Sequence, residues 1–215
     1  MEKLTPHYRP QHHHKLVMIM ALVLPLLLVA CAATQNVLTV SHASMPDWDL
    51  DEMVERSDAV VVGTISRELA SKGVPSGPPD DLDSLVLIFT DYELEVQRYL
   101  YPPLASPRTI AIMGVGGETE HKGTLVSFGL DQEPQFEVGE RVLLFLWHLP
   151  ADAYDIEGYS IPVGFTRDSY YDVLASRDYG KFVLAADNIG KDDQSGKSLA
   201  ISDVEAVIER VKGLP

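Results

Sequence analysis

Three side chains suited to acid–base chemistry follow a glycine-rich turn. Glu118, Glu120 and His121 come directly after the GVGG sequence at residues 114–117. A carboxylate beside an imidazole raises the pKa of the imidazole or shares a metal ion with it, and either arrangement suits a hydrolase. A hydrolytic zinc site usually needs three protein ligands, and no second histidine stands at helical or strand spacing from His121. We therefore predict a solvated polar loop here, with a hydrolase that uses these three side chains as the alternative.

A second acidic segment, residues 187–198, contains Asp187, Asp192 and Asp193. Calcium prefers oxygen ligands, and an EF-hand loop supplies them at alternate positions. This segment departs from that pattern because an isoleucine stands at its third position and a lysine at its fifth. The sequence therefore leaves open only a weak surface calcium site at the three aspartates.

The sequence contains none of the short motifs that mark common enzyme mechanisms. It lacks a G-x-S-x-G elbow, a G-x-x-x-x-G-K-[ST] loop, an H-E-x-x-H zinc motif and a G-x-G-x-x-G dinucleotide motif. The glycines at 114–117 also lack the later glycine and the helix that a bound phosphate would need. We expect a non-enzymatic protein with no cofactor and no metal.

Tyrosines provide the strongest candidates for ligand binding. Their rings offer rigid contact area with a polar tip, which suits the recognition of peptides and sugars. Half-buried strands are also rich in tyrosine, so the pattern favours a binding face only weakly. The candidate ligand-binding residues are Tyr92, Tyr154, Tyr159, Tyr170 and Tyr171.

The first thirty residues have the composition of a secretory signal peptide. Residues 1–15 carry three basic residues against one acid, and residues 16–30 are uncharged and almost wholly apolar. This apolar stretch is shorter than the roughly 20 residues of a membrane-spanning helix, and Pro25 interrupts it. A basic start, a short apolar core and small residues at its end predict a leader, residues 1–30, that is removed.

The leader ends in Leu28-Val29-Ala30-Cys31, and Cys31 is the only cysteine of the chain. This motif resembles the lipobox of bacterial lipoproteins. The resemblance implies that the Cys31 thiol is joined to a diacylglycerol, that the chain is cut just before it, and that the new N-terminus is acylated. Two acyl chains give stable anchoring, so we expect Cys31 to bind the protein to membrane lipid on the extracytoplasmic side of the cell membrane. An uncleaved signal anchor and a plain secretory signal are the alternatives.

The mature chain is strongly acidic. Removing the leader from a chain with 17 Lys and Arg and 32 Asp and Glu leaves 14 basic residues against 31 acids, a net charge of −17. Such a surface repels nucleic acid, so no nucleic-acid partner is expected. The lipidated cysteine and the small and polar residues after it, residues 31–46, are expected to form a flexible tether before a single domain, residues 47–215.

Apolar periodicity predicts a short helix from residue 47 to about residue 58 and a second helix over 201–211. Strands are expected between them, the most apolar being residues 141–147, and the polar segments 71–84 and 187–198 are expected to be loops. In one strand Asp91, Glu93 and Glu95 alternate with apolar residues, which predicts that these acids share a solvent face. The expected strands cover residues 59–65, 91–97, 109–113, 125–128, 141–147, 159–165 and 181–185.

The order of these elements is similar to that of one family. The segments SDAVVVGTI, DYELEVQRYLY and FEVGERVLLFL, with the long loop and the Gly-Gly turn, resemble extracytoplasmic bacterial domains related to the OB barrels of tissue inhibitors of metalloproteinases and netrins. The resemblance covers about residues 47–186. It implies a mostly β fold, a small antiparallel OB-like barrel of 5–7 strands with a short N-terminal helix and a C-terminal helix. The disulfides and the zinc-chelating cysteine of the animal inhibitors cannot be carried over, because Cys31 is the only cysteine.

These observations predict a membrane-anchored extracytoplasmic lipoprotein. Its domain is expected to bind an envelope or extracellular protein or peptide, by analogy with OB barrels, which bind ligands on one strand face and two loops. A purely structural envelope protein is the remaining alternative beside the hydrolase.

Overall fold

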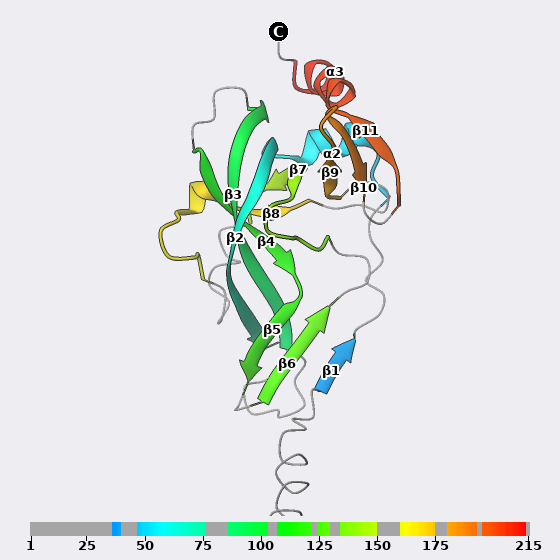
Figure 1. Ribbon diagram of the computed structural model, residues 1–215. Helices are drawn as coiled ribbons and strands as arrows, with labels where there is room; N and C mark the ends of the chain where they lie inside the picture. Colours follow the sequence, from blue (N-terminus) through cyan, green and yellow to red (C-terminus); the bar gives the residue numbers. More distant parts are fainter. Residues whose placement is uncertain are drawn as a thin grey trace, which may run out of the picture. The chain divides into compact units, whose positions relative to one another are not determined.

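The described part of the chain is mostly β-structure with a short helix near each end (Figure 1). The computed structural model describes residues 36–39, 47–75, 86–102, 107–121, 124–129, 134–149, 160–174, 180–192 and 195–213. The helices in these ranges are α2 (Leu50–Arg56) and α3 (Ile201–Lys212), together with the 3-10 turn η2 (Arg167–Ser169). The strands are β1 (Asn36–Thr39), β2 (Ala59–Pro75), β3 (Val86–Tyr101), β4 (Thr109–Val115), β5 (Gly117–His121), β6 (Thr124–Gly129), β7 (Arg141–Trp147), β8 (Tyr170–Val173), β9 (Phe182–Leu184), β10 (Ile189–Asp192) and β11 (Ser198–Ala200).

Eight strands form one sheet in the order β11-β10-β9-β7-β2-β3-β4-β8. An additional pairing joins β8 to β7, so β7, β2, β3, β4 and β8 form a closed cycle of hydrogen-bonded strands. Neighbours in this cycle are antiparallel except β4 and β8, which run parallel. The predicted mostly β fold is confirmed, whereas the predicted antiparallel pairing holds for this sheet except between β4 and β8. The predicted total of 5–7 strands is too low, because polar segments without an apolar signal also form strands among the described residues.

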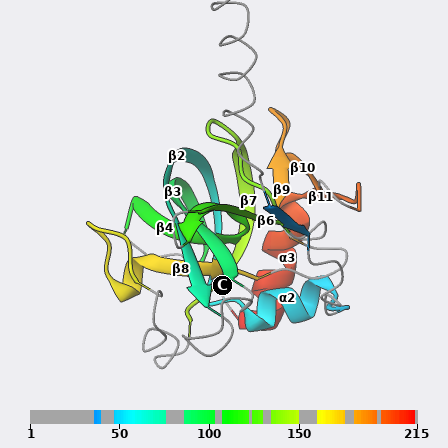
Figure 2. The ribbon, with the colours of Figure 1, turned by 90° about the horizontal axis from the view of Figure 1, so that it is seen from below.

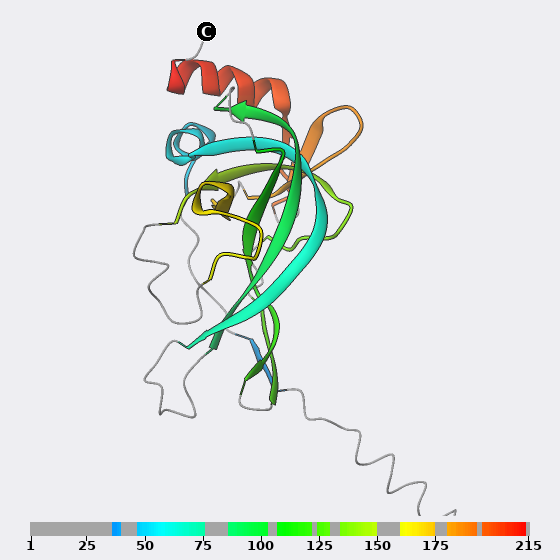
Figure 3. The same ribbon diagram turned by 90° about the vertical axis from the view of Figure 1, so that its left-hand side faces the viewer.

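The β2–β3 hairpin continues well beyond its pairing with β7. β2 pairs with β7 from Ala59 to Thr64 but with β3 from Val60 as far as Pro75. Its register with β3 shifts at four places, and such bulges increase the local twist of a strand pair. Near the far end of the hairpin lies a second sheet, β1-β6-β5 (Figure 3). β1 is part of the segment predicted to be a tether, and it pairs in parallel with β6.

The two helices lie side by side near the start of β2 (Figure 2). α2 begins with a capping box, in which the Asp49 carboxylate accepts from the Glu52 N–H at 3.0 Å and the Glu52 carboxylate accepts from the Asp49 N–H at 3.2 Å. Arg210 of α3 donates two hydrogen bonds to Asp51 of α2. Both predicted terminal helices are confirmed.

Two apolar cores lie on opposite faces of the sheet. Val60 and Val62 of β2 pack with the helices, whereas Val61 and Ile65 pack on the other face with apolar residues of β3, β4, β7 and β8. β7 alternates in the same way, with Leu143 on the helix side. Because both faces are covered here, β7 and the first part of β2, from Ala59 to Ile65, read as nearly continuous apolar runs. The prediction that residues 141–147 form a strand is confirmed.

Four local predictions of secondary structure are wrong. Glu118, Glu120 and His121, predicted to lie in a polar loop, belong to the strand β5, which pairs with β6. The segment 160–165 is not a strand, because it holds a turn with Gly164 at φ 95°. The predicted loops at 71–84 and 187–198 contain the end of β2 and all of β10, respectively. These polar residues are in strands because a neighbouring strand supplies partners for their backbone groups, which periodicity along one segment does not reveal.

Candidate functional site

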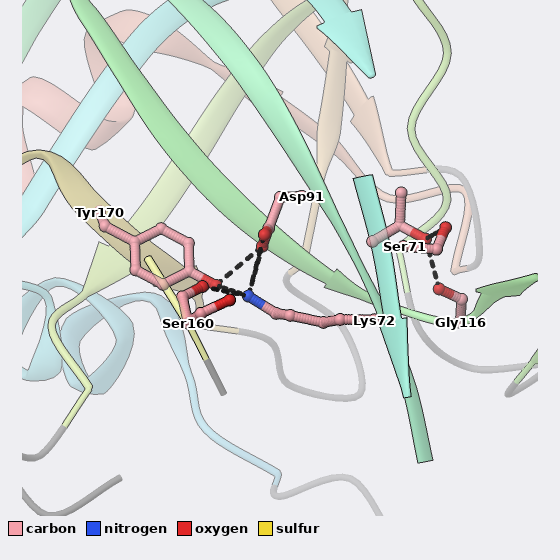
Figure 4. A network of polar contacts seen from close by, with 7 residues as sticks. Ser71, Lys72, Asp91, Gly116, Ser160 and Tyr170 are labelled. Carbon is pink, nitrogen blue, oxygen red and sulfur yellow. Dashed lines mark hydrogen bonds and ion pairs between the residues drawn. The ribbon is translucent and has the colours of Figure 1, made fainter. Parts of the chain in front are cut away.

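A network of buried polar side chains joins three strands where the β2–β3 hairpin extends past β7. Lys72 comes from β2, Asp91 from β3 and Tyr170 from β8 (Figure 4). The Lys72 Nζ atom donates to both carboxylate oxygens of Asp91, at 2.9 and 3.1 Å. The Tyr170 hydroxyl donates to Asp91 Oδ1 at 2.7 Å and accepts from Lys72 Nζ at the same distance. Residues far apart in sequence are thus held together by charge-assisted hydrogen bonds.

The network lies almost entirely out of solvent. Asp91 is 3% exposed and Tyr170 is fully buried, and the Lys72 side chain is 12% exposed. Burial raises the pKa of Asp91, while the hydrogen bonds and charge of Lys72 and the hydroxyl of Tyr170 act in the opposite direction. Lys72 also donates to the Ser160 carbonyl oxygen at 2.9 Å. Carboxylate, ammonium and hydroxyl are thus satisfied by protein groups, which is what buried charges require.

A separate set of hydrogen bonds, made by Ser71 and Thr90 just before Lys72 and Asp91 in the two strands, reaches toward the second sheet. Thr90 donates to the Gly116 carbonyl oxygen at 2.7 Å, and the Ser71 and Thr90 hydroxyl oxygens are 2.8 Å apart (Figure 4). Because Thr90 has a single O–H, Ser71 is the donor of the second bond. Gly117 follows with φ 125°, a backbone conformation that favours glycine. The junction between β4 and β5 is therefore fastened to the hairpin.

The hydrogen bonds of Lys72 and Asp91 hold neighbouring strands in place. Lys72 donates to acceptors from β3, β8 and the segment before η2, and Asp91 accepts from two strands. Together they fix the outer half of the hairpin to β8. The sequence did not reveal this network. Asp91 was predicted to share a solvent face with Glu93 and Glu95, but it is buried whereas Glu95 is exposed.

The predicted tyrosine face is described only in part. Tyr92 is half-buried beside Phe136, with ring centroids 5.2 Å apart, and burial raises the pKa of its hydroxyl. Tyr171 is buried, stacks on His148 at 4.2 Å and donates to the Asp168 carbonyl oxygen. The rings of Tyr170 and Tyr171 therefore contribute to packing rather than to an exposed surface. Tyr154, Tyr159 and Cys31 lie outside the described residues.

The three side chains considered for acid–base chemistry, Glu118, Glu120 and His121, all belong to β5. Glu118 and Glu120 are exposed and, two residues apart in β5, share one of its faces. His121 ends the same strand, and its side chain lies outside the described residues.

The residues of the predicted calcium site differ in exposure. Asp187 is exposed, whereas Asp192 is 4% exposed and accepts from the Ser195 N–H at 2.7 Å and the Gly180 N–H at 3.2 Å. Asp193 lies outside the described residues. In the part of the chain that the structure describes, no three His, Cys, Asp or Glu side chains gather as a metal site would require.

Comparison with known proteins assigns no family. No model of a protein family matches the sequence, and no curated protein matches it. None of the helices within the described residues is long and apolar enough to cross a membrane.

Proposed function

We propose that the protein is a lipoprotein anchored through Cys31 on the extracytoplasmic side of the cell membrane, where its domain binds an envelope or extracellular protein or peptide without catalysing a reaction. The observation that carries this proposal is the apolar, uncharged stretch at 16–30 that ends at the only cysteine of the chain. A leader of this length and composition directs export, and a lipid-bearing cysteine at its end holds the exported domain at the membrane.

The strand pairings support an OB-like barrel as the binding scaffold. An OB barrel is a five-stranded Greek-key barrel, and the cycle β2-β3-β4-β8-β7 has five members. The chain forms β2, β3 and β4 in order, and after β5 and β6 it returns as β7 to pair antiparallel with β2, the first of these strands, as in a Greek-key connection. OB barrels bind ligands on the face of their second and third strands. By this analogy the ligand lies over β3 and β4.

Replacing Cys31 tests the anchor directly. The wild-type chain should fractionate with membranes, and mass spectrometry of its N-terminus should find a lipid-modified Cys31. Cys31→Ala removes the only thiol that can carry the lipid, so membrane attachment through a lipid should be lost entirely. Thr34→Ala, in the same segment, should retain both the lipid and the membrane fractionation. An unmodified Cys31 in the wild-type protein, or the full-length chain free in the cytosol, would contradict the proposal.

Cross-linking in intact cells tests the binding role. Glu95 of β3 is exposed and pairs in register with Thr109 of β4, which places both on the proposed ligand face. A photo-reactive amino acid at Glu95 should capture one defined protein or peptide. The same probe at Val163, which is fully exposed in the turn before η2, should not capture it. Equal capture at both positions, or capture of lipid alone, would contradict the proposed binding face.

A further inference from the structure

A cavity of about 420 Å³ lies where the first turn of α3 meets β2, β3, β7 and the turn between β9 and β10. Its volume falls in the range of small-ligand sites, roughly 300–1,000 Å³. The side chains of two arginines, Arg98 and Arg141, lie in its wall. It shares no lining residue with the Lys72 network, and Tyr92, Tyr170 and Tyr171, the candidate tyrosines that the structure describes, do not line it.

Arg141 is held in place by three acceptors, one from β3 and two from the turn between β9 and β10. Its Nε–H donates to the Gln97 side-chain oxygen at 2.9 Å, and one N–H on Nη2 donates to Asn188 Oδ1 at 2.8 Å. One N–H on Nη1 donates to the Ala185 carbonyl oxygen at 3.3 Å. A guanidinium carries five N–H donors, so one donor remains on each terminal nitrogen. Neither has an acceptor among the described residues. Arg141 is therefore a pre-positioned cation with spare donors in the wall of a cavity.

The remaining charges of the wall favour a ligand with a single negative charge. Arg98 pairs with Glu205 of α3, which neutralises much of its charge. Asp187 brings a second carboxylate, which accepts from the Ile189 N–H at 3.2 Å. Two acids in the wall repel a doubly charged phosphate more strongly than a carboxylate, which is planar and matches the guanidinium fork. The same acids can accept hydrogen bonds from N–H groups beside that carboxylate.

Ser202 adds a neutral donor to the cavity. It is exposed in the first turn of α3, and its hydroxyl has no hydrogen-bond partner among the described residues. The end of a helix at which this residue stands also carries a partial positive charge. The cavity wall therefore carries the guanidinium of Arg141, the hydroxyl of Ser202 and the carboxylates of two acids. These groups match a ligand in which an anionic group stands beside N–H donors.

We propose that this cavity binds the C-terminal carboxylate of a peptide, with the carboxylate on Arg141 and the N–H groups of the peptide toward Glu205 and Asp187. The inference deepens the proposed peptide-binding function and rests on it. It is consistent with the proposed ligand face, because Gln97, which holds Arg141, is exposed and follows Glu95 by two residues in β3.

The test is an NMR titration of the purified mature protein in detergent with N-acetyl-Ala-Ala as the free acid and as the C-terminal amide. The free acid should shift the Arg141 Nε–H signal and the Ser202 amide signal, whereas the amide should leave both in place. Arg141→Met should weaken binding of the free acid at least tenfold, because a charge-assisted pair is lost. Arg108→Met should bind as the wild type does, since Arg108 is exposed outside the cavity.

Other results of the titration would contradict either the carboxylate site or the proposed function as a whole. Equal shifts with acid and amide, or none with either, would overturn the carboxylate site. Shifts with inorganic phosphate but not with the free acid would show an anion site of a different specificity and would also overturn it. An Arg141→Met protein that has lost its native spectrum is replaced by Arg141→Lys, which keeps the charge but loses the fork and should also bind more weakly. If the titration fails while Glu95 cross-linking still captures a partner, only the carboxylate inference is wrong.

Discussion

Replacing Asp91 by alanine should lower the free energy of unfolding by about 3–5 kcal/mol, since it leaves a buried ammonium without its carboxylate. The Lys72 side chain is only 12% exposed, so water cannot take over the role of the lost partner. Tyr170 would lose the acceptor of its hydroxyl proton at the same time. Urea denaturation of the protein, monitored by circular dichroism, measures the change in the midpoint and in the slope of the unfolding transition.

Two further variants separate the buried charge from a general loss of packing. Lys72→Met combined with Asp91→Leu removes both charges together, so it should be much less destabilising than Asp91→Ala alone. Arg67→Ala breaks the Arg67–Glu93 pair in the same hairpin, where the Arg67 side chain is 62% exposed, and should cost about 0–1 kcal/mol. An Asp91→Ala protein as stable as Arg67→Ala would show that the network does not brace the hairpin.

Gly117→Ala should destabilise the protein by about 2–4 kcal/mol, from an unfavourable backbone conformation and from the hydroxyl groups it would displace. A Cβ atom at this position would stand 2.1 Å from Thr90 Oγ1 and 2.9 Å from Ser71 Oγ. Gly117 also has φ 125°, which an L-residue rarely adopts. The substitution therefore acts on the connection between the hairpin and the second sheet.

Gly129→Ala is the matched control, because Gly129 ends the neighbouring strand β6 and a Cβ there would have no atom within 4 Å. Its effect should stay within about 0.5 kcal/mol of the wild type. Thermal unfolding of both variants measures the difference. Equal midpoints for Gly117→Ala and Gly129→Ala would rule out the close approach of the hairpin to the β4–β5 junction.

The elements predicted correctly are those whose signal is local. Residues 141–147 are an uninterrupted apolar run, and the structure buries both faces of that strand. The helix over 201–212 has apolar residues on one face and acids and bases on the other, and its buried residues are those of the apolar face. In each case the order of apolar and polar residues within the segment matches which of its faces are buried, so the segment alone was sufficient to predict its secondary structure.

The buried network was missed because its signal is not local. Lys72 stands in a polar stretch that reads as a loop, and Asp91 alternates with apolar residues in the manner of a solvent-facing acid. Their burial depends on each other and on Tyr170, which is 79 residues from Asp91 in the chain. No pattern within one segment could reveal that the three side chains meet.

The sequence alone determined the alternation of apolar residues that makes this chain mostly β, the two terminal helices and the acidic charge, and it contains the apolar N-terminal stretch and lone cysteine from which an exported lipoprotein is proposed. Only the tertiary structure decided that β8 returns to pair with β4 and β7, that Lys72 and Asp91 meet beneath a tyrosine, and that Arg141 lines a cavity beside α3. The reason is physical. Secondary structure follows from side chains a few residues apart, whereas strand order and buried ion pairs depend on contacts between groups that only the folded chain brings together.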